Sequence, residues 1–388
     1  MSQQTGSKVP KIRFNTCEGP WEVLPLSRAA SFRRGSFPQP YGLKKWYNGP
    51  GAMPFIQVVD VAKNLKLVEK TKQQISRAAQ PKSVFVEQGS VVVTLQGSIG
   101  RVAVSQYDAY ADRTLLIFTE YTNQTNTFFW AYLIQGKFDV EKERAPGGTI
   151  KTITKEALSA FQVALPNFKE QTQIGSYFKS LDRMIGLHQR KHDKLVTLKQ
   201  AMLQKMFPQD GATTPEIRFK GFEGDWQQKT LQQIVEVCSG RDYKHLTSGD
   251  IPVYGTGGYM LSVNEALSPD KDAIGIGRKG TIDKPYLLRC PFWTVDTLFY
   301  AVPLKEYDLD FVFCIFQIVD WKKFDESTGV PSLSKLAINQ ILQLKPSFKE
   351  QQRIGAYFRI LDELISKHAT QLEKLKNVKA ACLEKMFV

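Results

Sequence analysis

The chain has 388 residues and a formal net charge of +14, so it is long enough for two or three domains and basic enough to favour a polyanionic partner, with nucleic acid the first candidate. Its five cysteines are scattered and form no C-x-x-C pair, which argues against a disulfide framework or a zinc site and for a reducing compartment. The N-terminus has no apolar segment of the secretory kind and the longest apolar run, residues 311–319, is too short to span a bilayer, so we expect a soluble cytoplasmic protein with no membrane partner.

A motif near the start of the chain, VPKIRFNTCEGPW at residues 9–21, returns 205 residues later as TPEIRFKGFEGDW at residues 214–226. Residues 165–207 also align without a gap to residues 345–387, and about half of the positions in these two segments are identical. Repeats of this kind define the architecture of a chain. The chain is therefore an internal duplication, in which each half consists of a variable domain followed by a closing segment.

The two halves differ in length, because the opening motif repeats after 205 residues and the closing segment after 180. A weaker match between them, GSIG at 97–100 against GRKG at 277–280, also has the offset of 180. The first half therefore carries about 25 extra residues between Trp21 and GSIG, and we predict that they lie in the segment 31–55.

Each closing segment is predicted to form one long helix. Asn167-x-x-Glu170 and Ser347-x-x-Glu350 have the spacing of a capping box, and the segments that follow contain no proline for roughly ten turns. Apolar residues recur there at heptad spacing, and such a stripe requires a partner along its length, most simply the other copy in an antiparallel coiled coil. The stripe residues are Ile174, Phe178, Leu181, Met184, Ile185, Leu195, Leu198 and Met202 in the first copy, and Ile354, Phe358, Leu361, Leu364, Ile365, Leu375, Val378 and Cys382 in the second.

His188 and His368 interrupt the stripe at equivalent positions. A metal site or a pH switch is one interpretation, but no carboxylate or cysteine ligand set surrounds them, so we favour a polar residue that fixes the register of the coiled coil. Gly175 and Gly355 lie early in the helices, where we expect them to allow a close backbone approach or a slight bend.

The variable domains show short alternating runs broken at glycines, as in residues 82–105 and 249–263, which predict strands. Residues 309–324 fit either a buried helix or a strand with a basic end. The expected fold class is therefore α+β: two mixed domains with curved sheets, separated by two long helices that form an antiparallel coiled coil with pseudo-twofold symmetry.

The stretch AIGIGRKGTIDKPY at residues 273–286 has the glycine spacing of a dinucleotide-binding turn, G-x-G-x-x-G. Such a turn requires a helix at its end, but the residues after Gly280 favour a strand and Pro285 blocks a helix. The first copy shares only G-x-x-G, as Gly97 and Gly100 against Gly277 and Gly280. We therefore predict a strand–loop–strand turn, with no cofactor bound by this chain.

Glycines in such a turn let backbone amides approach phosphates, and neighbouring basic residues would then reach the DNA backbone or base edges. A plain hairpin with solvated basic residues fits the turn equally well, but the net charge and the duplication favour nucleic acid. The candidate DNA-binding residues are Arg33, Arg34, Tyr41, Lys44, Lys45, Gln96, Ser98, Arg101, Arg241, Tyr243, Lys244, Tyr254, Thr256, Tyr259, Arg278, Lys279 and Thr281.

Sequence motifs of catalysis are missing: there is no N-P-P-[YF] motif of an amino-methyltransferase and no P-loop. Pro269-Asp270 with Asp320-Trp321-Lys322 has a faint likeness to a nuclease motif, but the gap is long and the first half has no counterpart. His245 is the one histidine in a variable domain, and no obvious nucleophile adjoins it. We predict no catalytic residue and no metal site, with an autonomous nuclease as the alternative.

Three features together resemble the specificity subunit of Type I restriction–modification systems over essentially the whole chain. They are the duplicated opening P-x-I-R-F…E-G-x-W, the sequence F-K-E-Q-x-x-I-G-x-Y-F…L-D that leads each long helix, and YGTGG with IGRKGTID…FWTVDTLFY in the second half. The first half departs from the second in loop length and in lacking YGTGG.

The resemblance implies a non-catalytic DNA-binding subunit. Residues 1–165 and 208–345 would be target recognition domains that each read one half of a split, asymmetric double-stranded site, and residues 166–207 and 346–388 would be the helices that set the spacing. The subunit would hold two adenine methyltransferase subunits and, through them, restriction subunits. S-adenosylmethionine and ATP would bind to those partners.

Overall fold

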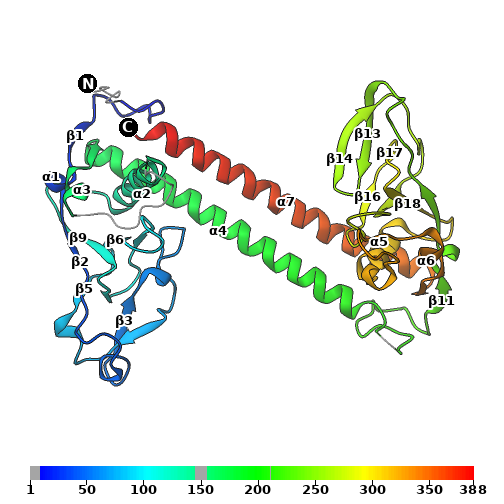
Figure 1. Ribbon diagram of the computed structural model, residues 1–388, viewed down its shortest axis with the longest axis horizontal. Coiled ribbons are helices and arrows are strands. Elements are labelled where there is room, and N and C mark those ends of the chain that lie inside the picture. Colours follow the sequence, from blue (N-terminus) through cyan, green and yellow to red (C-terminus); the bar gives the residue numbers. More distant parts are fainter. Residues whose placement is uncertain (1–8, 145–154, 210) are drawn as a thin grey trace. The chain divides into compact units, whose positions relative to one another are not determined.

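The computed structural model describes residues 9–144, 155–209 and 211–388 (Figure 1). The chain divides into two compact units, and the division falls inside both long helices. Unit 2 is the segment Gln189–Thr370, and unit 1 consists of the residues up to His188 together with Gln371–Val388. Each unit therefore contains one mixed domain and one half of each long helix. The proposed boundaries of the four sequence segments stay a prediction.

The two long helices are α4 (Phe168–Lys205) and α7 (Phe348–Met386), coloured green and orange-red in Figure 1. At 1.5 Å per residue they are each roughly 57–59 Å long. Asn167 Oδ1 accepts from the backbone N–H of Glu170 at 3.0 Å, and Ser347 Oγ accepts from that of Glu350 at 3.4 Å. The N-caps predicted from the sequence are thus present in both copies.

Contacts within each unit show that the helices pair antiparallel. In unit 1, Lys379 Nζ lies 2.6 Å from Asp182 Oδ1. In unit 2, Lys199 Nζ lies 2.6 Å from Asp362 Oδ1. Asp362 is the repeat equivalent of Asp182, and Lys379 is that of Lys199, so one ion pair occurs twice with the helices exchanged. The predicted antiparallel pairing is confirmed inside each unit.

The heptad stripe is only partly buried. Ile174, Phe178 and Leu181 belong to the core of unit 1, and their equivalents Ile354, Phe358 and Leu361 belong to that of unit 2. Four other stripe residues remain 37–40% exposed, because two helices alone cannot cover a broad apolar face: Met184, Leu198, Leu364 and Val378.

Unit 1 contains two four-stranded sheets and a two-stranded one (Figure 1). The first sheet, in order, is β2 (Ala30–Arg34), β9 (Leu115–Tyr121), β6 (Val91–Thr94) and β7 (Val102–Val104). The second is β4 (Gln73–Ile75), β3 (Met53–Ile56), β8 (Ala109–Ala111) and β5 (Val84–Val86). The third pairs β1 (Glu22–Pro25) with β10 (Gln162–Leu165). The helices of the domain are α1 (Leu26–Ala29), α2 (Thr127–Arg144) and α3 (Lys155–Ala160).

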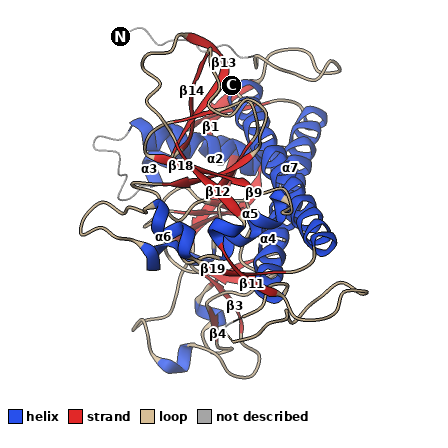
Figure 2. Cartoon of the chain, turned by 90° about the vertical axis from the view of Figure 1, so that its right-hand side faces the viewer, coloured by secondary structure: helices blue, strands red, loops and turns tan. Residues whose placement is uncertain are grey.

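Unit 2 repeats this topology with one strand fewer in its second sheet. Its strands are among those coloured red in Figure 2. Its first sheet is β12 (Val235–Ser239), β18 (Leu298–Pro303), β15 (Ala273–Gly277) and β16 (Tyr286–Leu288). Its second is β14 (Gly258–Val263), β13 (Ser248–Gly255) and β17 (Trp293–Thr294), and its third pairs β11 (Gln227–Thr230) with β19 (Leu342–Lys345). The helices are α5 (Leu309–Ile318) and α6 (Lys335–Gln340). Residues 309–318, left open between helix and strand by their sequence, are therefore a buried helix, and the expected mixed α+β fold is confirmed.

The strand registers correct the predicted place of the extra residues. Gly35 N–H donates to Leu115 O, and Gly240 N–H donates to Leu298 O, so these glycines are equivalent and lie 205 residues apart. Asp112 N–H donates to Ile56 O and Val295 N–H to Tyr254 O, which makes Ile56 and Tyr254 equivalent at an offset of 198. At β6 and β15, and again at β9 and β18, the offset is 183, and it reaches 180 at β10 and β19. Most of the insertion therefore lies after Ile56, outside the predicted segment 31–55.

The two helix glycines allow close backbone packing, as predicted. A Cβ on Gly175 would overlap Asn126 Oδ1 and lie 2.9 Å from the backbone nitrogen of Phe129 in α2. A Cβ on Gly355 would overlap Asp308 Oδ1 and lie 2.8 Å from the nitrogen of Phe311 in α5. Each long helix thus presses its glycine against the N-terminus of the domain's own helix. No helix of the described residues combines the length and apolar character needed to cross a membrane.

Candidate nucleic-acid interface

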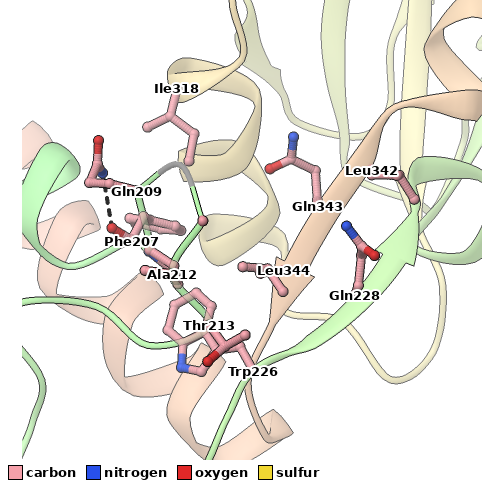
Figure 3. A pocket seen from close by; sticks show the side chains of 12 residues that line it. Phe207, Gln209, Ala212, Thr213, Trp226, Gln228, Ile318, Leu342, Gln343 and Leu344 are labelled. Atoms are coloured by element: carbon pink, nitrogen blue, oxygen red, sulfur yellow. Dashed lines mark hydrogen bonds between the residues drawn. The ribbon is translucent and has the colours of Figure 1, made fainter.

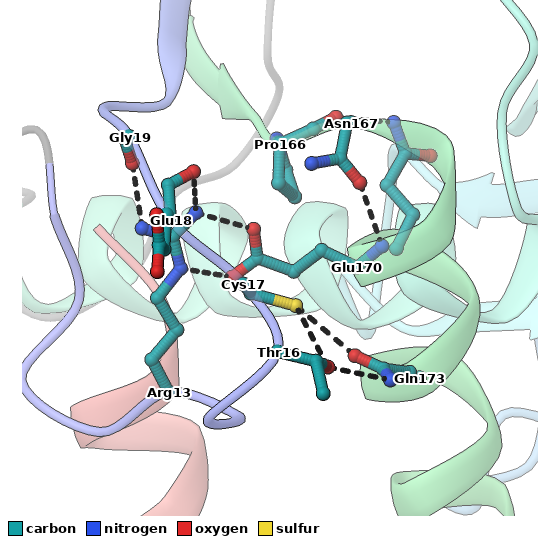
Figure 4. Close-up of polar contacts among 10 residues, drawn as sticks. Arg13, Thr16, Cys17, Glu18, Gly19, Pro166, Asn167, Glu170 and Gln173 are labelled. Atoms are coloured by element: carbon teal, nitrogen blue, oxygen red, sulfur yellow. Dashed lines mark hydrogen bonds and ion pairs between the residues drawn. The ribbon is translucent and has the colours of Figure 1, made fainter.

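The duplicated opening motif anchors each domain to a long helix (Figure 4). Arg13 donates to both carboxylate oxygens of Glu170, at 2.7 and 2.6 Å, and to the carbonyl oxygens of Glu18 and Gly19. Glu170 is fully buried in the first turn of α4. A bidentate guanidinium–carboxylate pair fixes orientation as well as distance, so this contact sets the position of the opening motif on α4.

Unit 2 contains the equivalent contact between opening motif and long helix, and we call each of these two ion pairs a joint. Arg218 donates to both oxygens of Glu350, at 2.7 and 2.8 Å, and to the carbonyl oxygens of Glu223 and Gly224. Hydrogen bonding to Glu350 raises the pKa of Arg218, so the guanidinium stays protonated. The sequence marked these residues as a repeat, but the ion pair itself spans 132 residues of chain and only the structure reveals it.

The turns 95–101 and 278–285 join antiparallel strands in their respective sheets, as predicted, and no helix follows either of them. Their register differs from the sequence match. Leu95 N–H donates to Thr114 O, and Arg278 N–H donates to Thr297 O, so Arg278 is equivalent to Leu95. Gly280 therefore corresponds to Gly97, not to Gly100.

The G-x-x-G correspondence is thus wrong by three residues, because a pair of glycines matches in more than one register. The pattern that the two turns share is Gly97-Ser98-Ile99 against Gly280-Thr281-Ile282. Both glycines have positive φ, +66° and +89°, and both isoleucines are buried. Gly277, the last residue of β15, is equivalent to Thr94. Of the three glycines of the apparent dinucleotide fingerprint, the first copy therefore has only the third, as Gly97.

Arg278 and Lys279 line a shallow groove in unit 2 with Ser239, Ser332 and Lys335. The Arg278 guanidinium lies 5.8 Å from the centre of the Phe299 ring, and both side chains of the Arg-Lys pair are exposed. The groove also contains Glu326, so three basic residues face one acidic residue, and its net charge is positive, as that of a phosphate-contacting surface would be.

Asp325 orders the loop that carries Ser332, one of the residues lining this groove. Backbone N–H groups of Ser332 and Ser327 donate to its carboxylate at 2.9 and 3.0 Å and lower the pKa of that carboxyl. The Gly280 N–H donates to Pro331 O, which ties the turn to this loop. The turn 278–285 is thus held by backbone hydrogen bonds to the loop that Asp325 orders.

In unit 1, Tyr41 contacts two segments that lie near the turn 95–101, the equivalent of the turn 278–285. Its hydroxyl accepts from Gln57 Nε2 at 3.0 Å, and the Arg113 guanidinium lies 5.7 Å from its ring centre. Gly97 in turn faces Val58, whose Cγ1 would lie 3.7 Å from a Cβ at that glycine. Three segments distant in sequence therefore converge beside the turn 95–101. Arg113, which occupies the place of Asp296 in unit 2, was not among the predicted residues.

The hairpin between β13 and β14 presents aromatic residues. Tyr254 lies with its ring centre 6.4 Å from that of Tyr259 and 6.1 Å from that of Tyr286, whose hydroxyl donates to Gly255 O at 2.6 Å. Burial raises the pKa of Tyr286, so this phenol stays neutral. Tyr259 is 63% exposed, and Thr256 lies in the turn itself.

The remaining predicted residues lie at several places. Arg33 and Arg34 are exposed on β2, and Lys44 and Lys45 belong to a short 3-10 helix in which Lys45 Nζ lies 4.5 Å from the Trp46 ring centre. Gln96 is exposed in its turn, whereas the side chain of Arg101 reaches back to Val61 O at 3.4 Å. Arg241, Tyr243 and Lys244 lie in the loop before β13, and Tyr243 packs against a small apolar cluster. The structure thus gathers Tyr41, Gln96, Ser98 and Arg101 in unit 1 and Tyr254, Thr256 and Tyr259 in unit 2.

A separate cavity of about 460 Å³ lies at the end of α4, where no predicted residue is found (Figure 3). Its wall combines the apolar side chains of Trp226, Ile318 and Leu344 with the amides of Gln228 and Gln343. Gln209 closes one side and donates to Phe207 O at 3.0 Å. Among the described residues of the wall there is no basic side chain, so the cavity does not share the chemistry of the turns.

The residues of the faint nuclease likeness serve other contacts. Trp321 is buried and donates to Phe316 O at 2.8 Å, while Lys322 forms an ion pair with Asp283 at 2.8 Å and lowers the pKa of that carboxyl. Asp270 is exposed. Within the described residues no group of three or more histidine, cysteine or acidic side chains is arranged to hold a metal ion.

Comparisons with known proteins agree with the two-copy organisation. A family model for the Type I restriction modification DNA specificity domain matches residues 39–197 and 223–377. The specificity subunit of the Type I restriction enzyme EcoprrI from Escherichia coli is 20% identical over 379 residues, which are 93% of this chain and 91% of that protein.

Among solved structures, the S subunit of a Type I restriction–modification system from M. genitalium superposes with a TM-score of 0.72 at 18% identity, covering 98% of this chain and 99% of that one. A chain from a study of complex assembly and conformational transition in the type I system gives a TM-score of 0.50 at 14% identity, covering 96% of this chain and 98% of that one. At these identities the structural likeness establishes the fold.

Proposed function

Because the chain belongs to the Type I restriction modification DNA specificity family, whose domains recognise DNA sequences, we propose that its two units read the two halves of one split target. The observation that carries this proposal is the combination of a repeated fold with different turns. The strand topology and the anchoring ion pair occur in both units, whereas the turn residues equivalent to Arg278, Lys279 and Asp296 are Leu95, Gln96 and Arg113. Two readers with different side chains recognise different half-sites, so the target is bipartite and asymmetric.

The chain also serves as a scaffold for two copies of one adenine methyltransferase subunit, and restriction subunits join through them. Two quasi-equivalent surfaces bind two identical partners. Supporting this role, equivalent apolar residues are exposed on the long helices: Met184 and Val378 in unit 1, and Leu364 and Leu198 in unit 2. Exposed apolar groups that recur in equivalent places mark a protein contact more convincingly than a single exposed residue does.

Catalysis lies with the partner subunits, where S-adenosylmethionine and ATP bind. This chain contributes the geometry: side chains on the turns contact base edges and phosphates, and the helices hold the half-sites at a set spacing. Phosphate contacts position the domain and base contacts specify the sequence.

A domain-duplication chimera tests the proposal. Residues 227–345 are replaced by residues 22–165, which have the same flanking strands, since β1 with β10 and β11 with β19 form the same antiparallel pair. Wild-type and chimeric chains are each assembled with their methyltransferase subunits, and the methylated adenines are mapped by sequencing DNA treated with S-adenosylmethionine.

The wild-type complex is expected to contain two methyltransferase copies and to modify an asymmetric split target, and the chimera to modify an inverted repeat of the first half-site. An unchanged asymmetric target in the chimera would refute the assignment of one half-site to each unit. The isolated chain is incubated with DNA, Mg²⁺ and S-adenosylmethionine as a control. Cleavage or methyl transfer by it would favour the alternative, an autonomous enzyme.

A further inference from the structure

The segment between β3 and β4 in unit 1, residues 57–72, has no counterpart of similar length in unit 2. There the equivalent strands β13 and β14 are joined by the two-residue turn Thr256-Gly257. The offset between the copies falls from 198 residues at Ile56 to 183 at Thr94, so this part of the first copy is 15 residues longer. We name residues 57–72 the inserted loop.

The insertion changes the local charge. Residues 57–90 contain six lysines and arginines against three acidic residues, whereas the corresponding residues 255–273 contain one basic and three acidic residues. Four of the six cations belong to the inserted loop and are exposed: Lys63, Lys66, Lys70 and Lys72. None of these four ammonium groups forms an ion pair with a carboxylate of the described residues. They are therefore available to an external anion.

The inserted loop is anchored at its ends. Asp60 is 2% exposed, and its two carboxylate oxygens accept from the backbone N–H groups of Gln57 and Lys72 at 2.8 and 2.9 Å. One buried side chain thus holds the first and last residues of the loop together. The order that this imposes lowers the entropy lost when the lysines bind a partner.

The middle of the loop is fixed by apolar residues. Val61, Leu65 and Leu67 are each at most 5% exposed, and Leu65 accepts from Val104 N–H at 3.1 Å on the edge strand β7. Because these side chains point into the domain, Lys63 and Lys66, which lie among them, point to solvent. The loop is a rigid basic ridge on the side of the sheet.

This ridge adjoins the turn 95–101. Arg101 Nη1 donates to Val61 O at 3.4 Å, and Gly97 faces Val58. The lysines therefore extend the surface that already contains Gln96 and Ser98. The exposed cations outnumber the one exposed amide among them, that of Asn64, and such a charge-rich surface fits a phosphate backbone, whose contacts carry affinity but no sequence information.

We propose that the inserted loop is a clamp for the DNA phosphate backbone, so that unit 1 supplies more of the salt-dependent affinity than unit 2. The inference rests on the proposed DNA-binding function. Unit 2, with its short hairpin and exposed Tyr259, depends less on charge. Unit 1 thus contributes more electrostatic attraction to the phosphates, and unit 2 depends more on contacts with base edges.

The test measures binding of the full chain to a fluorescent duplex of about 30 base pairs by anisotropy, at salt concentrations from about 50 to 300 mM. The variant K63Q/K66Q/K70Q/K72Q removes the four charges. Each phosphate contact contributes about 0.9 to the slope of log affinity against log salt, so the slope is expected to fall by about 3 to 4. The matched control K169Q/K220Q/K305Q/K349Q removes four exposed lysines elsewhere and is expected to change the slope by less than about 1.

A second variant, with all four lysines of the loop changed to arginine, keeps the charge and is expected to retain the wild-type slope, which separates lost contacts from a misfolded loop. Equal slopes for the glutamine variant and its control would overturn the clamp. Wild-type chain that shows no salt-dependent DNA binding would instead contradict the proposed function itself.

Discussion

The joint between domain and helix is built from the same residues in the two units, whereas the turns between their sheet strands share only Gly-Ser/Thr-Ile. Arg13 with Glu170 and Arg218 with Glu350 form bidentate pairs of the same geometry. At the turns, Arg278 replaces the buried Leu95, and the hairpin of unit 2 takes the place of a basic loop. Under the proposed function, the same ion pair suits either unit, whereas the turns must differ if the two half-sites differ.

The largest expected effect comes from breaking the joint. Arg13→Met and Arg218→Met each leave a buried carboxylate without its cation, which costs about 3–5 kcal/mol in the free energy of unfolding. Urea unfolding, followed by fluorescence, is expected to show a loss of similar size for both single variants. A large loss in one unit and none in the other would show that the joints are not equivalent.

The helix glycines offer a second, smaller test of equivalence. Gly175→Ala and Gly355→Ala each force a Cβ into a capping side chain and a backbone nitrogen, and overpacking of this kind costs about 1–3 kcal/mol. Gly136→Ala is the matched control, because Gly136 lies on α2 with open space at its Cβ position. There alanine is expected to stabilise the helix by about 0.5–1 kcal/mol. Thermal unfolding measures all three, and a neutral Gly175→Ala would contradict the close packing.

The smallest effect is expected at the ion pairs between the helices. Asp182 with Lys379 and Asp362 with Lys199 are partly exposed, and pairs of this kind contribute about 0.2–1 kcal/mol. Asp362→Lys with Lys199→Asp reverses the pair in unit 2 and is expected to restore most of the stability lost in each single variant, whereas in unit 1 Asp182 also accepts from the Tyr132 hydroxyl. A double-mutant cycle in urea measures the coupling energy, and its screening by salt separates charge from packing. Coupling in one unit alone would break the symmetry of the helix pair.

The comparison also shows why sequence matching failed at the turns. GSIG and GRKG align at the offset of the long helices, but the hydrogen bonds of Leu95 and Arg278 place Gly280 opposite Gly97 at an offset of 183. Short glycine patterns match in several registers, whereas a strand ladder permits one. The insertion was misplaced for a related reason. The extra residues are divided among three places, with seven between Gly35 and Ile56, fifteen between Ile56 and Thr94 and three after Leu115, and a difference of offsets reports only their sum.

The amino-acid sequence by itself determined the internal duplication, the two long helices with their caps, and the family; for Gly175 and Gly355 it left a close approach or a slight bend open. These follow from local periodicity, spacing and repetition, which are properties of neighbouring residues. Only the tertiary structure decided that Arg13 reaches Glu170, that Asp60 closes the inserted loop, and that Arg113 and Tyr41 meet beside the turn 95–101. Such contacts join residues far apart in the chain, and their partners are chosen by strand register and burial, which no local pattern specifies.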